Sequence, residues 1–420
     1  MHEKNTESNL KCLAAPQARL LLQDTDGQRS CETDGSNVRR FMKYPRKDML
    51  QPVKRVVVKI GSGVLTTKEG LNLDLINSLS EDICHLMEKR GLQIILVSSG
   101  AIASGLKKVG LSQRPQSISQ QQALAAVGQS SLMLAYEEVF RRHGHKVAQV
   151  LVTRDDLTNR KRYLNTRNTL FTLLNWEVIP IINENDTVVV DEIKFGDNDN
   201  LSAMIANLTG AHLVINLTTI DGLFDDDPRL NSNAQLISLV EKVTSKIEKK
   251  ASSIPGALGK GGMGSKVKAA RDVAICGIPT IIGNGLKKSI MRKIFQGKEE
   301  GTLFLPQPTP MRSRKHWIAF TKSPKGRIMV DSGAEDAVVN NGKSLLPSGI
   351  LAVYGKFNLG NSVMIINRKE KSLAVGLVNY HSIDVEKIMG QKSSKIEKIL
   401  GYKHYDEVIH KDNLVLMSNL

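Results

Sequence analysis

The 420-residue sequence has no apolar run that approaches the roughly 18 residues required to cross a bilayer. Its N-terminus also lacks the basic start and the long apolar core of a secretory signal. The four cysteines, Cys12, Cys31, Cys84 and Cys276, are scattered, so no close pair suggests a zinc site or a redox couple. We therefore expect a cytoplasmic protein without a membrane span, whose thiols are structural or incidental.

The composition is that of an ordinary globular chain, with 41% hydrophobic and 24% charged residues. A chain of this length has room for two or three domains. The formal net charge of +16 at pH 7 favours an anionic partner. That partner could be nucleic acid, a membrane surface or a phosphorylated small molecule, and the charge alone does not choose between them.

Short apolar runs alternate with helical periodicity from Arg55 onward, whereas residues 1–51 are mixed polar and charged and are expected to form a disordered extension. A helix is predicted from Asp74 to Arg90, before Gly91. Buried strands separated by helices predict an α/β fold, with an open, mainly parallel sheet and helices on both faces. The predicted strands are Val56 to Ile60, Ile94 to Ser98, Val147 to Thr153, Val178 to Asn183, Leu213 to Thr218 and Thr280 to Ile282.

Polar or glycine-rich segments follow these strands, at the edge where open parallel sheets bind ligands. "KIGSGVLT" places Lys59 at the end of the first strand, but it is neither a dinucleotide fingerprint nor a Walker loop. "SSGAIASG" offers Ser98, Ser99 and Gly100 at the turn into a helix, a suitable place for amides that bind an anion. "GKGGMGSKVKAA" ends a glycine loop with Lys266 at a helix start. These segments predict one ligand site rich in lysine and glycine.

Four short polar residues, "DNDN" at 197–200, precede a run of apolar residues at helical spacing. A calcium loop is excluded, because Leu201 and Ser202 stand where a ligand and the sharp-turn glycine are needed. A helix N-cap explains one of the four residues, since one cap needs only one such side chain. Capping and a role in the site therefore both stay open for this segment.

The motifs resemble those of the glutamate 5-kinase family in the amino acid kinase superfamily. The resemblance runs from about Arg55 to Gln307 and implies a catalytic domain at 52–307. The combination of "INEND" with "GDNDNLSA" is its most specific part. The matching segments, in the order of the family, are "VVVKIGSGVLT", "VSSGAIASG", "LAAVGQ", "VLVTRDDL", "VIPIINENDTV", "KFGDNDNLSA", "GLFDDDPR", "GKGGMGSK" and "GTLFLPQ".

The resemblance implies transfer of the ATP γ-phosphoryl group to the side-chain carboxylate of L-glutamate, the first step of proline biosynthesis, with Mg²⁺ as cofactor. A carboxylate nucleophile with a pKa near ~4.3 is already ionised and needs no general base. The reaction needs positive charge on its transition state, and Lys59 and Lys266 are the candidates. By similarity to the family, Asp199 would hold these lysines in position rather than accept a proton. By similarity, glutamate would bind at Ser99, Asp186 and Asn198.

The nucleotide side of the resemblance has two departures. The family usually has a Thr-Asp pair after the fifth strand, whereas Thr218 is followed here by Thr219, with Asp221 nearby. Lys260 stands where a small hydroxylated residue is common. No protein metal site is expected. The residues implied for ATP are Lys59, Thr218, Thr219, Lys260, Gly261, Gly262, Met263, Gly264, Ser265 and Lys266.

The C-terminal part has short alternating strands broken by glycines, as in "GRIMVD", "SVMIIN" and "LAVGLVNY". It resembles a PUA domain, a small β-barrel expected at 308–400 and followed by a tail at 401–420. PUA domains elsewhere bind RNA, so an RNA-binding protein is one alternative function. Another is a sibling kinase acting on a different carboxylate or on a nucleoside phosphate. The resemblance also implies a homotetramer and feedback inhibition by proline.

Overall fold

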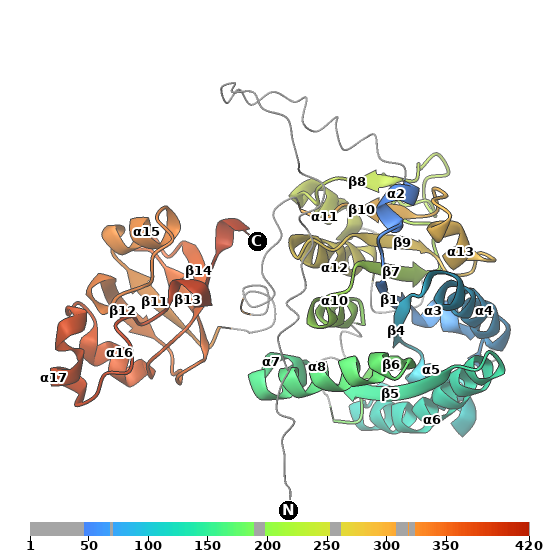
Figure 1. Cartoon of the computed structure of the whole chain (residues 1–420), viewed down its shortest axis with the longest axis horizontal. Helices are drawn as coiled ribbons and strands as arrows, with labels where there is room; N and C mark the ends of the chain where they lie inside the picture. The colour runs from blue at the N-terminus through green and yellow to red at the C-terminus, as the bar shows by residue number, and fades with distance from the viewer. Residues whose placement is uncertain are drawn as a thin grey trace, which may run out of the picture. The chain divides into compact units, whose positions relative to one another are not determined.

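The computed structural model describes residues 46–67, 70–188, 198–252, 262–307, 318 and 324–419. These residues form an α/β body and, later in the chain, a smaller β-rich body (Figure 1). In this part of the chain, no helix combines the length and apolarity that a membrane span requires. The expected α/β class is confirmed.

An eight-stranded sheet organises the α/β body, in the order β5-β6-β4-β1-β7-β9-β10-β8. The strands from β5 to β9 run parallel, whereas β10 is antiparallel to β9 and pairs in parallel with β8. The six predicted strands are all present, with ends shifted by at most two residues. Their bounds are β1 Arg55–Ile60, β4 Gln93–Ser98, β5 Lys146–Val152, β6 Val178–Glu184, β7 Leu213–Thr218, β8 Leu239–Val240, β9 Thr280–Asn284 and β10 Thr302–Phe304. A two-stranded ribbon, β2 Thr66–Thr67 with β3 Gly70–Leu71, stands apart.

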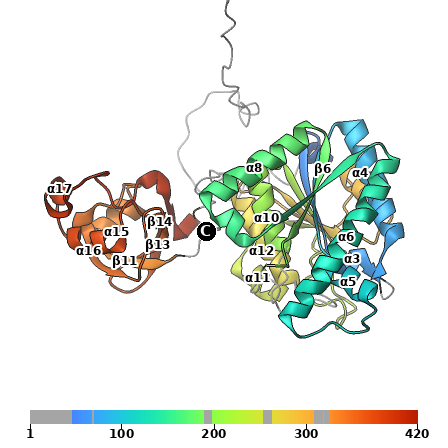
Figure 2. The same cartoon turned by 90° about the horizontal axis from the view of Figure 1, so that it is seen from below.

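Helices cover both faces of this sheet (Figure 2). Alternate residues of β1 show the two layers, since Val56 and Val58 belong to one apolar cluster and Val57 to the other. The first cluster includes residues of α3 Ser62–Leu65, α4 Leu73–Arg90, α6 Ile118–Arg142 and α13 Ile290–Phe295. The second includes residues of α7 Arg154–Thr158, α8 Arg160–Asn175, α10 Asn198–Thr209 and α12 Met263–Ile275. Two further helices, α5 Ala101–Val109 and α11 Ser245–Ser252, complete the body.

Helices α5 and α6 cross at two glycines. An ideal Cβ on Gly128 would lie 1.8 Å from the carbonyl oxygen of Ala101, and one on Gly105 would lie 1.9 Å from that of Leu124. Real Cβ atoms do not approach backbone oxygen so closely, so both positions require glycine. The crossing sets the "LAAVGQ" segment of α6 directly against the first turn of α5, which begins just after Ser99 and Gly100.

A short helix, α2 Arg46–Leu50, lies within the 1–51 segment that we expected to be disordered. For residues 46–50 that expectation is wrong, because Leu50 is buried in the first apolar cluster and the Arg46 guanidinium donates to the carbonyl oxygens of Ser238, Glu300 and Gly301. One leucine and one arginine in a polar context gave no periodicity to detect. Residues 1–45 lie outside the described part of the chain.

Two N-terminal truncations should separate this helix from the segment before it. A chain that starts at Pro45 is expected to keep the unfolding free energy of the full chain, whereas one that starts at Gln51 should lose about 2 kcal/mol, the contribution of one buried leucine and the Arg46 hydrogen bonds. Urea denaturation of both proteins measures the difference. Equal stability of the two would show that α2 contributes nothing.

The C-terminal body contains a five-stranded sheet in the order β12-β11-β13-β14-β15. Its last strand lies in the 401–420 segment that we predicted to be a tail. That prediction is wrong, because β15 pairs with β14 and buries Leu414 and Val415. Three apolar residues after a polar stretch were too short a signal. The elements are β11 Gly326–Val330, α15 Ser332–Val339, η2 Pro347–Gly349, β12 Ile350–Tyr354, β13 Ser362–Ile366, β14 Ser372–Leu377, α16 Ser382–Ile388, η3 Ser393–Lys395, α17 Ile396–Leu400, η4 Lys411–Asn413, β15 Leu414–Leu416 and η5 Met417–Asn419.

Candidate active site

A buried carboxylate joins two lysines at the carboxyl end of the central strands. Asp199 Oδ1 lies 2.6 Å from Lys59 Nζ, and Asp199 Oδ2 lies 3.1 Å from Lys266 Nζ. Ser265 Oγ donates to Oδ2 at 2.6 Å, and Asn216 Nδ2 donates to Oδ1 at 2.9 Å. Both carboxylate oxygens are therefore occupied, and Asp199 is only 2% exposed. We call Asp199, Lys59 and Lys266 the lysine clamp.

The three side chains of the lysine clamp come from β1, α10 and α12. Lys59 alternates with Val57 on β1, so it points to the same face of the sheet as α10. Asn216 of β7 pairs in register with Lys59, which brings its amide to the same carboxylate. Lys266 belongs to α12, which begins one residue after Gly262, and Asp199 is the second residue of α10.

Charge in the clamp is unbalanced toward the positive side, since two ammonium groups face one carboxylate. Burial alone would raise the pKa of Asp199, but Lys59, Lys266 and the Ser265 hydroxyl hold it well below its usual range. Asp199 therefore stays ionised at any physiological pH and cannot serve as a proton acceptor. A cluster with a net charge of about +1, held at the end of a parallel sheet, favours a strongly anionic ligand.

Asn198 lies beside the clamp and does not cap α10 with its side chain. Its Nδ2 donates to Ser99 Oγ at 2.8 Å, to Asn183 Oδ1 at 3.1 Å and to the carbonyl oxygen of Ser98 at 3.3 Å. The amide thus joins the ends of β4 and β6 to the start of α10. Asp197, the other candidate cap, lies outside the described residues. Within "DNDN", Asn198 and Asp199 therefore lie with the other predicted site residues at the end of the sheet.

Asp186 lies in the turn that follows the carboxyl end of β6, two residues after Glu184. Burial raises its pKa to about 6, and the positive charge of Arg114 acts in the opposite direction. Arg114 comes from the segment between α5 and α6, where its guanidinium donates to Gln121 Oε1. Arg114 is exposed, so this pair of opposite charges borders on solvent.

The residues expected on the nucleotide side are partly described. Thr218 is the last residue of β7, and Thr219 follows it. Thr219 lies close to Gly63, since a Cβ on that glycine would be 3.0 Å from Thr219 Cγ2. Asp221 is not a free substitute for the family's Asp at position 219. Its carboxylate already accepts a hydrogen bond from Asn284 and pairs with Lys287 at 3.1 Å. Gly262, Met263, Gly264 and Ser265 lead into α12, whereas Lys260 and Gly261 lie outside the described residues.

The structure brings together Lys59, Lys266 and Asp199, and also Ser99 with Asn198, as the sequence predicted. Sequence reasoning missed Asn183, Asn216, Gln129 and Arg114. For the two asparagines a signal existed, since each interrupts an otherwise apolar strand, in "VIPIINE" and "LVINLT". Gln129 stood in the quoted "LAAVGQ" segment without a role. Arg114 had no signal, because it lies in a polar connection.

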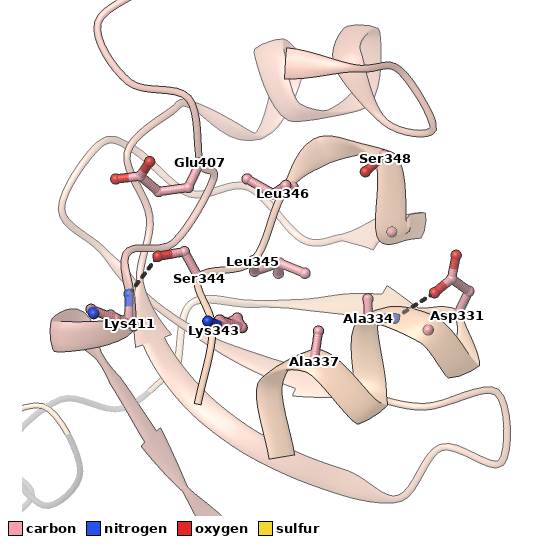
Figure 3. A pocket seen from close by; sticks show the side chains of 12 residues that line it. Asp331, Ala334, Ala337, Lys343, Ser344, Leu345, Leu346, Ser348, Glu407 and Lys411 are labelled. Carbon is pink, nitrogen blue, oxygen red and sulfur yellow. Dashed lines mark hydrogen bonds between the residues drawn. The ribbon is translucent and has the colours of Figure 1, made fainter. Parts of the chain in front are cut away.

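The C-terminal body contains a cavity of its own. A cavity of about 720 Å³ is lined by residues of α15, of the segment 343–349 and by Glu407 and Lys411 (Figure 3). The lining includes two lysines, Lys343 and Lys411, and two acidic residues, Glu407 and Asp331. Asp331 caps α15 by accepting from the Ala334 amide.

Comparisons with known proteins find chains similar to this one. A glutamate 5-kinase of Syntrophotalea carbinolica is 50% identical over 371 residues, which are 88% of this chain and 99% of that protein. A glutamate 5-kinase of Syntrophus aciditrophicus is 52% identical over 376 residues, 90% of this chain and 97% of that protein. Among solved structures, UMP kinase from Ureaplasma parvum aligns with a TM-score of 0.42 at 16% identity, over 60% of this chain and 99% of that one.

Family models match both bodies of the chain. Residues 326–400 match the PUA domain. Residues 54–284, more than half of the chain, match the amino acid kinase family and include the lysine clamp, Ser99, Asp186 and Asn198. With this match and the full-length similarity described above, the chain belongs to the amino acid kinase family.

Proposed function

We propose that this protein transfers the γ-phosphoryl group of ATP to the side-chain carboxylate of L-glutamate, forming L-glutamyl 5-phosphate for proline biosynthesis. The observation that carries the proposal is the lysine clamp beside the Ser99 and Asn198 pair, at the carboxyl edge of the sheet. Relatives about 50% identical over nearly their whole length carry the name of this activity.

In this mechanism the protein supplies positioning and positive charge. The acceptor carboxylate is already an anion at neutral pH, so no base is required. Lys59 and Lys266 allow that anion to approach the triphosphate and stabilise the charge that develops on the transferring group. Asp199 holds both ammonium groups in place, since it is buried and bonded on both oxygens. Ser99, Asp186 and Asn198 hold the amino acid, and Thr218, Thr219 and the start of α12 face the nucleotide.

Mg²⁺ fits this site as a companion of the nucleotide. Asp199, the carboxylate of the lysine clamp, already binds two lysines, Ser265 and Asn216. Mg²⁺ commonly binds through substrate phosphates and water with only one or two protein ligands. Bound to ATP, the ion would neutralise part of the phosphate charge. Positioning of the two substrates would remain the task of the side chains of this chain.

A panel of acceptors tests the proposal. We expect ADP release from ATP to depend on L-glutamate and to stay near background with aspartate, N-acetylglutamate or UMP. The acyl phosphate product can be trapped with hydroxylamine. Release that depended on UMP or on another carboxylate, with none for glutamate, would assign the chain to a sibling kinase of the same family.

Asp186→Asn should raise the KM for glutamate at least tenfold, about 1.4 kcal/mol. The reason is that the ionised carboxylate of Asp186 pairs with the α-ammonium of glutamate in our proposal, and the amide keeps the size but not the charge. The KM for ATP should change little. Saturation curves for both substrates, with a melting curve of the same variant, check this. A higher KM for ATP with an unchanged one for glutamate would place Asp186 on the nucleotide side.

The raised pKa of Asp186 predicts a pH dependence of the same constant. Because only the ionised form attracts the ammonium group, the KM for glutamate should be flat above about pH 7 and should rise as pH falls through about 6. Below that pKa, the rise should level off near the factor by which Asp186→Asn raises the same KM, because the protonated carboxyl is as uncharged as the amide. Kinetics from pH 5.5 to 8 measure it, and Asp186→Asn should abolish the rise. A rise that persisted in the variant would point to a different titrating group.

The cavity of the C-terminal body supports a second candidate function, binding of RNA. Lys343 and Lys411 place two exposed cations at a hollow of a PUA domain. Gel shifts with a structured RNA, compared with the Lys343→Glu and Lys411→Glu variants, would test it.

Assembly into a homotetramer and inhibition by proline are further proposals from the resemblance. Light scattering tests the first, and inhibition assays with proline test the second.

A further inference from the structure

Gln129 of α6 is buried next to the proposed acceptor site, where it bonds to Asn183, a residue that itself bonds to Asn198. Its side chain is 7% exposed, and its Oε1 accepts from Asn183 Nδ2 at 3.0 Å. Its own Nε2 has no hydrogen-bond partner within the described residues. A buried amide group without a partner costs about 1 to 3 kcal/mol, so stability alone does not explain the glutamine. A leucine or methionine would fill the same space without that cost.

The direction of the hydrogen bonds in this array follows from one backbone atom. The Glu184 N–H is a donor that cannot be exchanged, and it donates to Asn183 Oδ1 at 2.9 Å. Asn183 must therefore direct its Nδ2 toward Gln129. The Oε1 of Gln129 accepts this hydrogen bond. On the other side, Asn183 Oδ1 also accepts from Asn198 Nδ2. The hydrogen-bond partners of each side-chain amide thus determine which of its two ends is the oxygen and which is the nitrogen.

The same logic decides what the array presents to a ligand. Because Asn198 uses Nδ2 for Asn183 and Ser99, its Oδ1 is left as a buried acceptor without a partner within the described residues. Ser99 Oγ accepts from Asn198, so its hydroxyl proton remains available to donate. An acceptor beside a donor suits a ligand with an ammonium group and a carboxylate group.

We propose that Gln129 is a positioning residue, which acts through Asn183 to hold the Asn198 amide in the orientation that binds the amino-acid substrate. This inference rests on the proposed function and adds to it a residue on a helix outside the loops of the site. The close crossing of α5 and α6 at Gly128 is what brings the neighbouring Gln129 within reach of β6.

A double-mutant cycle in the full-length protein tests the proposal. Gln129→Met keeps the size and removes the acceptor, and we expect a rise of about tenfold in the KM for glutamate, with the KM for ATP within twofold and an unchanged melting temperature. Asn183→Leu should raise the KM for glutamate as well. In the Asn183→Leu background, Gln129→Met should add no further change, because the glutamine acts only through Asn183.

The matched control is Gln120→Met, since Gln120 is exposed on the same helix and should leave all constants unchanged. If turnover of a variant is too low, calorimetric titration with glutamate replaces KM. Additive effects of the two substitutions, or an unchanged glutamate KM in Gln129→Met, would overturn the proposal. A wild-type protein that phosphorylated a different acceptor would refute the proposed function instead, and the cycle would then be measured with that acceptor.

Discussion

Lys266→Ala is expected to lower kcat at least about 100-fold, close to 3 kcal/mol, with a much smaller effect on either KM. The ammonium of Lys266 lies 3.1 Å from Asp199 and, in the proposed mechanism, meets charge that develops during transfer more than charge present in the bound substrates. Asp199 keeps Lys59 at 2.6 Å in the variant, so the carboxylate is not left unpaired and the fold should persist.

Steady-state kinetics of both substrates, beside a melting curve, measure this effect. Lys268→Ala is the matched control, because Lys268 is exposed on the same helix and removes an equal charge. A variant of Lys266 with near-normal kcat and only weaker binding of ATP would show that the lysine binds the ground state and does not stabilise the transition state.

Gly128→Ala should lower the unfolding free energy by about 3 kcal/mol or more, although it adds a single methyl group. That methyl carbon would lie 1.8 Å from the Ala101 carbonyl oxygen and 2.3 Å from the Gly105 amide nitrogen, so α5 and α6 must separate. Separation also displaces Gln129 and the turn at Ser99. We therefore expect a higher KM for glutamate in whatever fraction stays folded.

Chemical denaturation of Gly128→Ala and of Gly283→Ala provides the comparison. Gly283 has no positive φ, and the nearest atom to its added Cβ would be 3.9 Å away, so alanine there should be neutral or slightly stabilising. Equal stability of the two variants would mean that the helices can part at little cost, and the crossing would then not be what places Gln129.

The strand pattern predicted the layered sheet and the edge that carries the polar site segments, whereas the pairing of Asp199 with the two lysines was implied by the family resemblance. Buried parallel strands appear as continuous apolar runs, and the polar residues that directly follow them, such as Ser99, collect at one edge. Interactions between distant segments gave no such pattern. Gln129 reaches Asn183 only because two helices cross at glycines, and β15 exists only because β14 offers it an edge. Both depend on tertiary contacts that no local periodicity encodes.

Strand β15 has a consequence for shortened forms of the protein. A reading-frame error or proteolytic cut ahead of Leu414 would remove only the last few residues, yet it would leave β14 with a row of unpaired backbone groups. Apolar side chains of β14, such as Ala374 and Val375, would lie along that open edge. Open strand edges recruit other chains. Such fragments should therefore self-associate. By pairing with the edge of β14, β15 protects the full chain from this aggregation.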